Sequence, residues 1–234
     1  MKRPLAPGIA LIVCALAFAA VSALELAPGD ARGDGDNPAD SLEYLAQFGL
    51  FYSYSGFALV VGGAALVVAV VGIRHLMGRQ SLAFAAASTI GMLGGGFLIV
   101  AGVMRMQANG TVPHIANLNR SWGEAAYLAV QMAGTQGLLS AGMLALAAWL
   151  VAFGLVLWRR GVRVPALAAV LPTLVLLILL GDLALPFLVA PDGLFVFYIL
   201  AIVAGVPICS LVFGLTLLRD RARRNLENTN PLNA

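Results

Sequence analysis

Residues 80–104, QSLAFAAASTIGMLGGGFLIVAGVM, form a stretch of 25 residues without a single charged side chain. About 20 consecutive apolar residues are enough for an α-helix to cross the hydrocarbon core of a bilayer. An apolar stretch of this length favours a membrane-spanning helix over the buried helix of a soluble protein. We therefore predict a transmembrane helix here and looked for others on either side of it.

Similar stretches recur along the whole chain. Residues 164–191 contain only one charge, Asp182, and four further stretches contain none: 4–24, 44–73, 125–158 and 193–218. We expect an all-α integral membrane protein with a six-helix transmembrane bundle. The predicted spans are residues 5–25, 48–73, 82–104, 125–158, 164–190 and 194–218. Residues 1–218 then form one transmembrane domain, because no connection is long enough for another, and residues 219–234 form a basic tail.

The composition agrees with this fold class. Hydrophobic residues make up 61% of the chain and charged residues 11%, whereas soluble domains contain about 25% charged residues. So few charges would not cover the surface of a soluble protein of 234 residues. The composition excludes a soluble globular protein, a disordered chain and a nucleic-acid-binding protein. The expected partners are the lipid bilayer and either another membrane protein or further copies of this chain.

The basic residues predict the orientation of the bundle. Six spans place both termini on one side, and that side receives 11 of the 14 basic residues; the other three are Arg32, Arg105 and Arg120. Basic residues favour the cytoplasmic side, so both termini are predicted to be cytoplasmic. Abundant alanine, with arginine preferred to lysine, is typical of GC-rich bacteria, which makes the expected location the bacterial inner (plasma) membrane.

Two features leave alternatives open. Lys2-Arg3, an apolar stretch and Val21-Ser22-Ala23 also resemble a cleaved signal peptide, whose removal would leave five helices in the same orientation. The stretch 125–158 would reach about 51 Å as a helix, against a hydrocarbon core of about 30 Å. We therefore expect Trp122–Gln131 to lie in the outer interface or to project above it, with Gly134 and Gly137 as candidate bending points.

Small residues recur four apart along two of the spans: Ala83, Ala87, Gly91 and Gly95 in one, and Gly137, Ala141 and Ala145 in the other. Such spacing lets helices approach closely in a membrane. Internal packing is the favoured interpretation, with a dimer interface as the alternative.

Residue content excludes sites that need a lysine inside the membrane, a pair of histidines at one depth or a pair of cysteines close in the chain. The only lysine is Lys2, and the only histidines, His75 and His114, are predicted to lie in loops on opposite sides. Cys14 and Cys209 belong to different spans, and no paired-cysteine, nucleotide-binding or zinc-protease motif is present. The sequence therefore predicts no catalytic residue, no metal site and no cofactor.

Asp182 is the one ionisable residue well inside a predicted span. Charged residues within a membrane face the bundle or a cavity and mark functional sites by default. Arg105, at the outer end of the third span, is its expected partner, and Arg120 is the second choice. The structural interpretation, which is slightly favoured, is a salt bridge that only joins helices or a protonated Asp182 bonded to a backbone carbonyl.

A polar stripe adds further candidate ligand-binding residues. Glu124, Tyr127 and Gln131 are spaced three and four residues apart, so they share one helical face. Together with Asp182, Arg105 and the tyrosines of the second span, Tyr52 among them, the stripe predicts a polar cavity that opens outward. The alternative is a water-facing first turn with ordinary interhelical hydrogen bonds.

The order of features resembles one family. A Gly- and Leu-rich fourth span ends in Leu157-Trp158-Arg159-Arg160-Gly161, and a proline-containing fifth span follows. Over residues 8–218 the chain resembles an uncharacterised bacterial family of small multi-pass membrane proteins, defined by a domain of unknown function. The resemblance implies a membrane location but no activity and no catalytic residues.

Three functions compete on this evidence. The favoured one is a non-enzymatic accessory or assembly partner of another membrane protein, which predicts an exposed small-residue face and no deep cavity. The alternative is a carrier or binder of a small or lipidic solute in a cavity around Asp182. A membrane enzyme using Glu124, Asp182 or His114 ranks last, because the sequence places no two of them close together.

Overall fold

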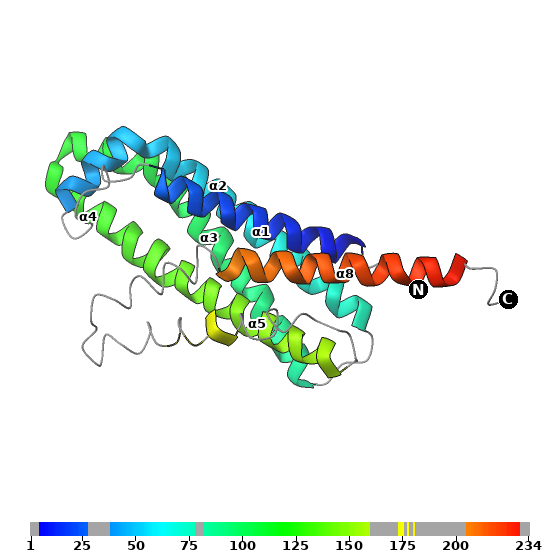
Figure 1. The fold of residues 1–234 in the computed structure, drawn as a ribbon. Coiled ribbons are helices and arrows are strands. Elements are labelled where there is room, and N and C mark those ends of the chain that lie inside the picture. Colours follow the sequence, from blue (N-terminus) through cyan, green and yellow to red (C-terminus); the bar gives the residue numbers. More distant parts are fainter. Residues whose placement is uncertain are drawn as a thin grey trace.

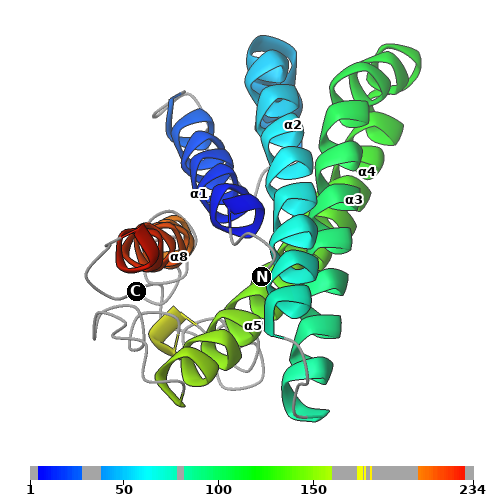
Figure 2. The same ribbon diagram turned by 90° about the vertical axis from the view of Figure 1, so that its right-hand side faces the viewer.

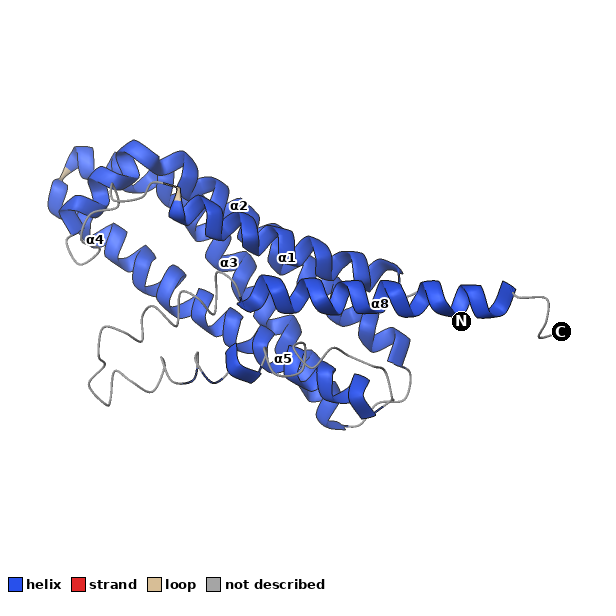
Figure 3. Cartoon of the chain, viewed as in Figure 1, coloured by secondary structure: helices blue, strands red, loops and turns tan. Residues whose placement is uncertain are grey.

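The computed structural model describes residues 5–27, 38–77, 82–159 and 205–229, together with 173–175, 177 and 180. Every regular element in this part of the chain is helical (Figures 1 and 3), which confirms the predicted all-α class. In chain order the elements are α1 (Leu5–Leu26), α2 (Pro38–Met77), α3 (Leu82–Leu118), α4 (Arg120–Val130), the π-helix η2 (Gln131–Leu139), α5 (Ser140–Arg159) and α8 (Val206–Thr229).

Four helices in the described ranges are long and apolar enough to cross a membrane: Leu5–Leu24, Leu42–Met77, Leu82–Leu118 and the continuous helical stretch Arg120–Arg159. They contain the first four predicted spans. A shorter apolar stretch, Val206–Arg219, begins α8, which continues as a helix into the predicted basic tail. The predicted fifth span and the first half of the sixth lie largely outside the described residues.

The helices pack in a defined order. α2 lies between α1 and α3, and α8 lies against α1 (Figure 2). α3 also packs against α4, η2 and α5. α3 is thus the helix that has most of the contacts between the α1–α2 pair and these three elements, whereas α8 reaches the pair through α1.

The backbones of α2 and α3 touch at glycines. A Cβ atom added at Gly63 would lie 2.6 Å from the carbonyl oxygen of Gly95, and one at Gly56 would lie 2.6 Å from that of Gly102. One added at Gly49 would collide with the side-chain amide of Asn109. The contacts recur every seven residues on both antiparallel helices, which is the coiled-coil period. Small residues allow this approach, and packing replaces the hydrophobic effect between helices in lipid.

The contact between α3 and α5 uses small residues in the same way. A Cβ at Gly91 would lie 2.8 Å from Cγ of Trp149, and one at Gly94 would lie 2.7 Å from Cβ of Ala145. Gly91, Gly95 and Ala145, from the predicted small-residue ladders, therefore lie in internal contacts. Gly137, by contrast, is exposed.

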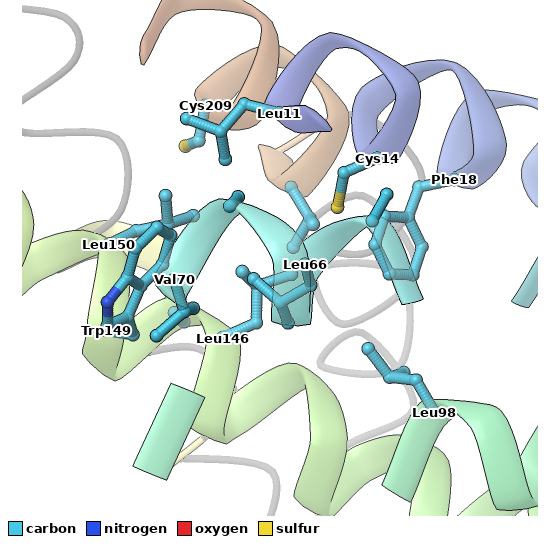
Figure 4. Close-up of a cluster of buried hydrophobic side chains, with 14 of the residues drawn as sticks. Leu11, Cys14, Phe18, Leu66, Val70, Leu98, Leu146, Trp149, Leu150 and Cys209 are labelled. Carbon is cyan, nitrogen blue, oxygen red and sulfur yellow. The ribbon is translucent and has the colours of Figure 1, made fainter. Parts of the chain in front are cut away.

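The main core fills the space among α1, α2, α3, α5 and α8 (Figure 4). At its centre Trp149 stacks on Phe153, with ring centroids 5.5 Å apart, and Phe153 contacts Phe213 of α8 at 5.2 Å. Ser22 and Ser88, which are buried, each donate a hydrogen bond to the carbonyl four residues earlier. Their hydroxyls are thus satisfied within their own helices, as an apolar surrounding requires.

The exposed faces of α2 and α3 define an apolar band. On α3 the exposed side chains are apolar from Leu82 to Met106, except Thr89, and those from Gln107 to Asn117 are polar. On α2 the band runs from Leu50 to Val71. Both lengths correspond to about 30–36 Å of helix, close to the thickness of a hydrocarbon core.

The helices continue beyond one edge of this band and form a cap. We use this name for residues 38–49 of α2, residues 107–118 of α3, and α4. The cap has a small core of its own, centred on Leu45, Tyr52, Ala108 and Val112 and covered by Leu42, Ala126, Tyr127 and Val130. The helices thus extend well past the predicted spans.

Two expectations from the sequence, both about loops, are wrong. The segment expected to connect the third and fourth spans, residues 105–124, is helical except at Asn119, and His75 and His114 lie in helices rather than loops. Asn119 is the N-cap of α4, and its Oδ1 accepts hydrogen bonds from the backbone N–H groups of Ser121 (3.0 Å) and Trp122 (3.4 Å). The polar sequence remains helical because its apolar positions pack in the cap core.

Bends occur where the band meets the cap. Phe48 interrupts α2 with non-helical angles (φ −116°, ψ 18°), just before the band begins. The π-helix η2 contains Gly134 and Gly137, the positions predicted as bending points. A Cβ at Gly134 would lie 3.5 Å from Cβ of Met104, so η2 meets α3 at the edge of the band.

The glycine contacts predict a clear asymmetry among alanine substitutions. Gly63→Ala or Gly102→Ala would push a methyl group against a backbone carbonyl, and we expect each to lower the free energy of unfolding by roughly 1–3 kcal/mol. Gly96→Ala is the matched control, because nothing lies within 4 Å of its added Cβ; it should be neutral or slightly stabilising. Reversible unfolding in mixed detergent micelles measures the difference, and equal effects at the three positions would contradict the contact.

Candidate functional site

Arg105 is a buried cation between α2 and α3. Its side chain is only 2% exposed, although the next residue, Met106, is exposed at the edge of the apolar band. It follows Gly102 by three residues and so shares the face of α3 that touches α2. A Cβ at Gly56 would lie 3.0 Å from Cβ of Arg105, which places the α2 backbone directly beside the arginine.

Two residues of α2 contact the guanidinium group. Arg105 Nη1 donates a hydrogen bond to Ser55 Oγ at 3.2 Å. Ser55 Oγ in turn donates to the carbonyl oxygen of Tyr52 at 2.9 Å. Arg105 Cζ lies 5.3 Å from the centre of the Tyr52 ring, within the range of a cation–π interaction. We call Arg105, Ser55 and Tyr52 the Arg105 cluster.

The cluster compensates a charge that is expensive to bury. Removing an ion from water costs several kcal/mol unless hydrogen bonds and nearby dipoles or rings replace the lost hydration. Ser55 serves as acceptor toward Arg105 and as donor toward its own helix, so it links the cation to the α2 backbone. The tyrosine ring adds an electrostatic attraction that is stronger where the cation is desolvated.

The cluster also marks a boundary within the molecule. Tyr52 belongs to the cap core, and Tyr127 of α4 packs against that core. On the other side of Arg105, Leu98 and Ala101 of α3 belong to the main core. Arg105 therefore lies where the apolar band ends and the cap begins, which is the depth at which a membrane protein meets its interface.

The predicted site residues divide into three groups. Arg105 and Tyr52 are in contact, and Tyr127 packs against the cap core to which Tyr52 belongs. Glu124 instead forms an ion pair with Arg120 on α4 (3.3 Å), where the Arg120 side chain is 74% exposed. Gln131 is half-buried at the start of η2. Asp182 lies outside the described residues, so its pairing with Arg105 and the cavity around it stay predictions.

Ser55 was not anticipated. Its position three residues after Tyr52 puts both on one face of the helix, but a serine inside an apolar span usually bonds only to its own backbone. The burial of Arg105 was also missed, because the residue was assigned to the end of a span. Its spacing from Gly95 and Gly102 indicates the burial, because it places Arg105 on the glycine face of α3.

A metal site does not arise among these residues. Within the described ranges no group of three or more histidine, cysteine, aspartate or glutamate side chains converges on one point. Comparison with protein-family models, with curated proteins and with solved structures found no match for this chain. The resemblance to a multi-pass membrane family therefore stays a prediction.

A double-mutant cycle tests the Arg105–Tyr52 contact. We expect Arg105→Met and Tyr52→Leu to show a coupling of about 0.5–2 kcal/mol in the free energy of unfolding, the range of cation–π contacts. Tyr54→Leu is the matched control, since Tyr54 is 59% exposed on the same helix; its coupling to Arg105→Met should stay below about 0.5 kcal/mol. The contact is disproved if both cycles give the same coupling.

Proposed function

We propose that the chain is a non-enzymatic integral membrane protein that acts as an accessory or assembly partner of another membrane protein. In this proposal it has six transmembrane helices, both termini in the cytoplasm, and a location in a bacterial plasma membrane. Four helices of membrane-spanning length support the membrane location. The distribution of 11 of 14 basic residues on the side of the termini supports the orientation.

The observation that carries the proposal is the use of polar groups inside the apolar band. Ser22 and Ser88 each bond to a carbonyl of their own helix, and Ser55 joins Arg105 to a carbonyl of α2. A carrier or an enzyme needs polar groups directed at a shared point or path. In the described helices Ser22 and Ser88 are instead satisfied within their own helices, and the Ser55–Arg105 bond joins α2 to α3, as expected of a scaffold.

Close glycine contacts support the same conclusion. The α2–α3 and α3–α5 interfaces bring backbone against backbone at some glycines and against side chains such as Trp149 and Leu98 at others. Packed interfaces of this kind have few alternative arrangements. A bundle built this way is suited to holding a binding surface in a fixed position.

The cap offers such a surface. α4 exposes Trp122 and Leu128, and Leu118 is exposed just before them. On the other faces of the cap the exposed residues include Glu43, Gln47, Gln107 and His114. Exposed apolar side chains beyond the hydrocarbon region are typical of protein–protein contacts. We infer that this surface binds the partner.

One observation favours the alternative, a carrier or binder of a small or lipidic solute near Asp182. Arginine binds carboxylates and phosphates with two parallel hydrogen bonds, and Arg105 lies at the edge of the band beside Tyr52. An anionic group reaching this depth from outside would meet a cation already held in place.

The proposal predicts that the binding of a partner protein depends on the cap. Purification from native membranes in mild detergent should yield a stoichiometric complex with another membrane polypeptide, and Trp122→Ser should weaken it at least about 30-fold, as for a central interface tryptophan. Trp158→Ser is the matched control at the other end of the bundle, where Trp158 is 73% exposed, and should leave the complex intact. A different outcome would contradict this function and support the alternative: the protein purifies as a monomer, a solute raises its thermal stability, and Asp182→Asn abolishes that stabilisation.

The orientation predicts the accessibility of introduced cysteines. Both natural cysteines are buried, so they give little background labelling. Ser121→Cys, in the exposed cap, should react with a membrane-impermeant maleimide in intact spheroplasts. His75→Cys, exposed at the opposite end of α2, should react only after lysis. The reverse pattern would place the termini outside.

A further inference from the structure

Exposed arginines lie at the end of the bundle opposite the cap. Arg74 near the end of α2, Arg159 at the end of α5 and Arg219 of α8 are all exposed. The C-terminal ends of α2 and α5 lie at the same end of the molecule (Figure 1). We call these three residues, together with Trp158, the basic rim.

Contacts around α1 place two of these arginines at one level. A Cβ at Gly72 would lie 3.1 Å from Pro7, and a Cβ at Gly8 would lie 3.0 Å from Leu218. Arg74 follows Gly72 by two residues, and Arg219 follows Leu218 directly. The first turn of α1 is therefore flanked by an arginine-bearing segment on each side.

The rim lies just beyond the apolar band. On α2 the exposed apolar face ends at Val71, so Arg74 is within one turn of its edge. Trp158, next to Arg159, is one of the most exposed large side chains in the described residues. Tryptophan favours the headgroup level because its ring is apolar and its N–H is polar. Arginine extends its apolar stem along the band and its charge toward the headgroups.

The cap end lacks this arrangement. Its exposed arginine among the described residues, Arg120, is paired with Glu124, and Arg105 is buried. The rim thus exposes arginines on three separate helices, whereas at the cap the exposed Arg120 is paired with Glu124, and Glu43 adds an exposed acidic side chain. This charge difference identifies the occupant of the rim as an anion-bearing surface.

We infer that the basic rim binds the headgroups of anionic phospholipids. The guanidinium groups donate hydrogen bonds to the phosphodiester oxygens, and the net negative charge of the leaflet adds a general attraction. Trp158 packs its ring against the glycerol and upper acyl region of the same lipids. The inference rests on the proposed membrane orientation, which turns this end toward the cytoplasmic leaflet.

Trp158 supplies the probe for a test. Quenching of its fluorescence by lipids brominated on the acyl chains compares phosphatidylglycerol with phosphatidylcholine at the same position. Full-length Trp122→Phe protein, reconstituted in vesicles of each composition, leaves Trp158 as the exposed tryptophan, since Trp149 is buried. We expect phosphatidylglycerol to bind several-fold more strongly, and added salt to reduce the preference.

Arginine substitutions assign the preference to the rim. Arg159→Gln should weaken phosphatidylglycerol binding about fivefold, which corresponds to the roughly 1 kcal/mol that one basic residue contributes near an anionic surface. Arg159→Lys should retain most of it. Arg120→Gln, the matched control at the cap end, should change nothing.

The outcomes separate this inference from the proposed function. Equal quenching by the two brominated lipids, or equal losses in Arg159→Gln and Arg120→Gln, would overturn the lipid site while leaving the membrane location intact. No quenching of Trp158 by either lipid would overturn the membrane location as well, because the rim would then not touch a bilayer.

Discussion

The direct backbone contact between α2 and α3 is the constraint on which the other features depend. Two backbone contacts, Gly56 with Gly102 and Gly63 with Gly95, and a third contact of Gly49 with the Asn109 side chain recur at a seven-residue interval. The interval equals two turns of a supercoiled helix, so all three lie on one stripe. Between helices in lipid, dispersion forces at close range replace the hydrophobic effect. Losing one contact therefore loosens the whole stripe.

The same stripe determines the environment of Arg105. The arginine follows Gly102 on the contact face, so the crossing that brings the backbones together also encloses the side chain. Its charge must then be satisfied by whatever α2 places opposite, which is the hydroxyl of Ser55 and the ring of Tyr52. The depth of the cluster follows from the register of the crossing, and it falls where the band meets the cap.

The sequence predicted the first four long apolar helices well and their ends poorly. A stretch of 20 or more residues without a charge, such as 80–104, is recognisable without any knowledge of packing. Hydropathy, however, marks the apolar band and not the helix. α3 continues to Leu118 because Ala108 and Val112 pack on Leu45 in the cap, and no local pattern reveals a partner more than 60 residues away in the chain. Hydropathy also could not reveal that His114 lies within this extension.

In the candidate site, too, the sequence predicted some features and not others. Arg105 and Tyr52 were recognised because charges and aromatic rings near the end of a span stand out by residue type. Their mutual contact depends on the register of two antiparallel helices, which composition does not determine. Glu124 was assigned to a polar stripe, but its i,i+4 spacing from Arg120 is a local feature that favours a surface ion pair. Residue type thus predicted membership of the site, and only packing determined the partners.

One end of the bundle carries the basic rim and the other the cap, and this difference fits a bundle that holds a binding surface at a fixed height. In the proposed orientation the basic rim holds one end at the headgroups of the inner leaflet, while the glycine crossing keeps α2 and α3 from sliding past each other. Residues 107–118 of α3 then raise the cap by about 18 Å above the outer edge of the apolar band. A carrier that alternates between two states would need such contacts to break and re-form. Backbone contacts without intervening side chains resist that exchange, so the packing favours a bundle that holds Trp122 and its neighbours at a constant height.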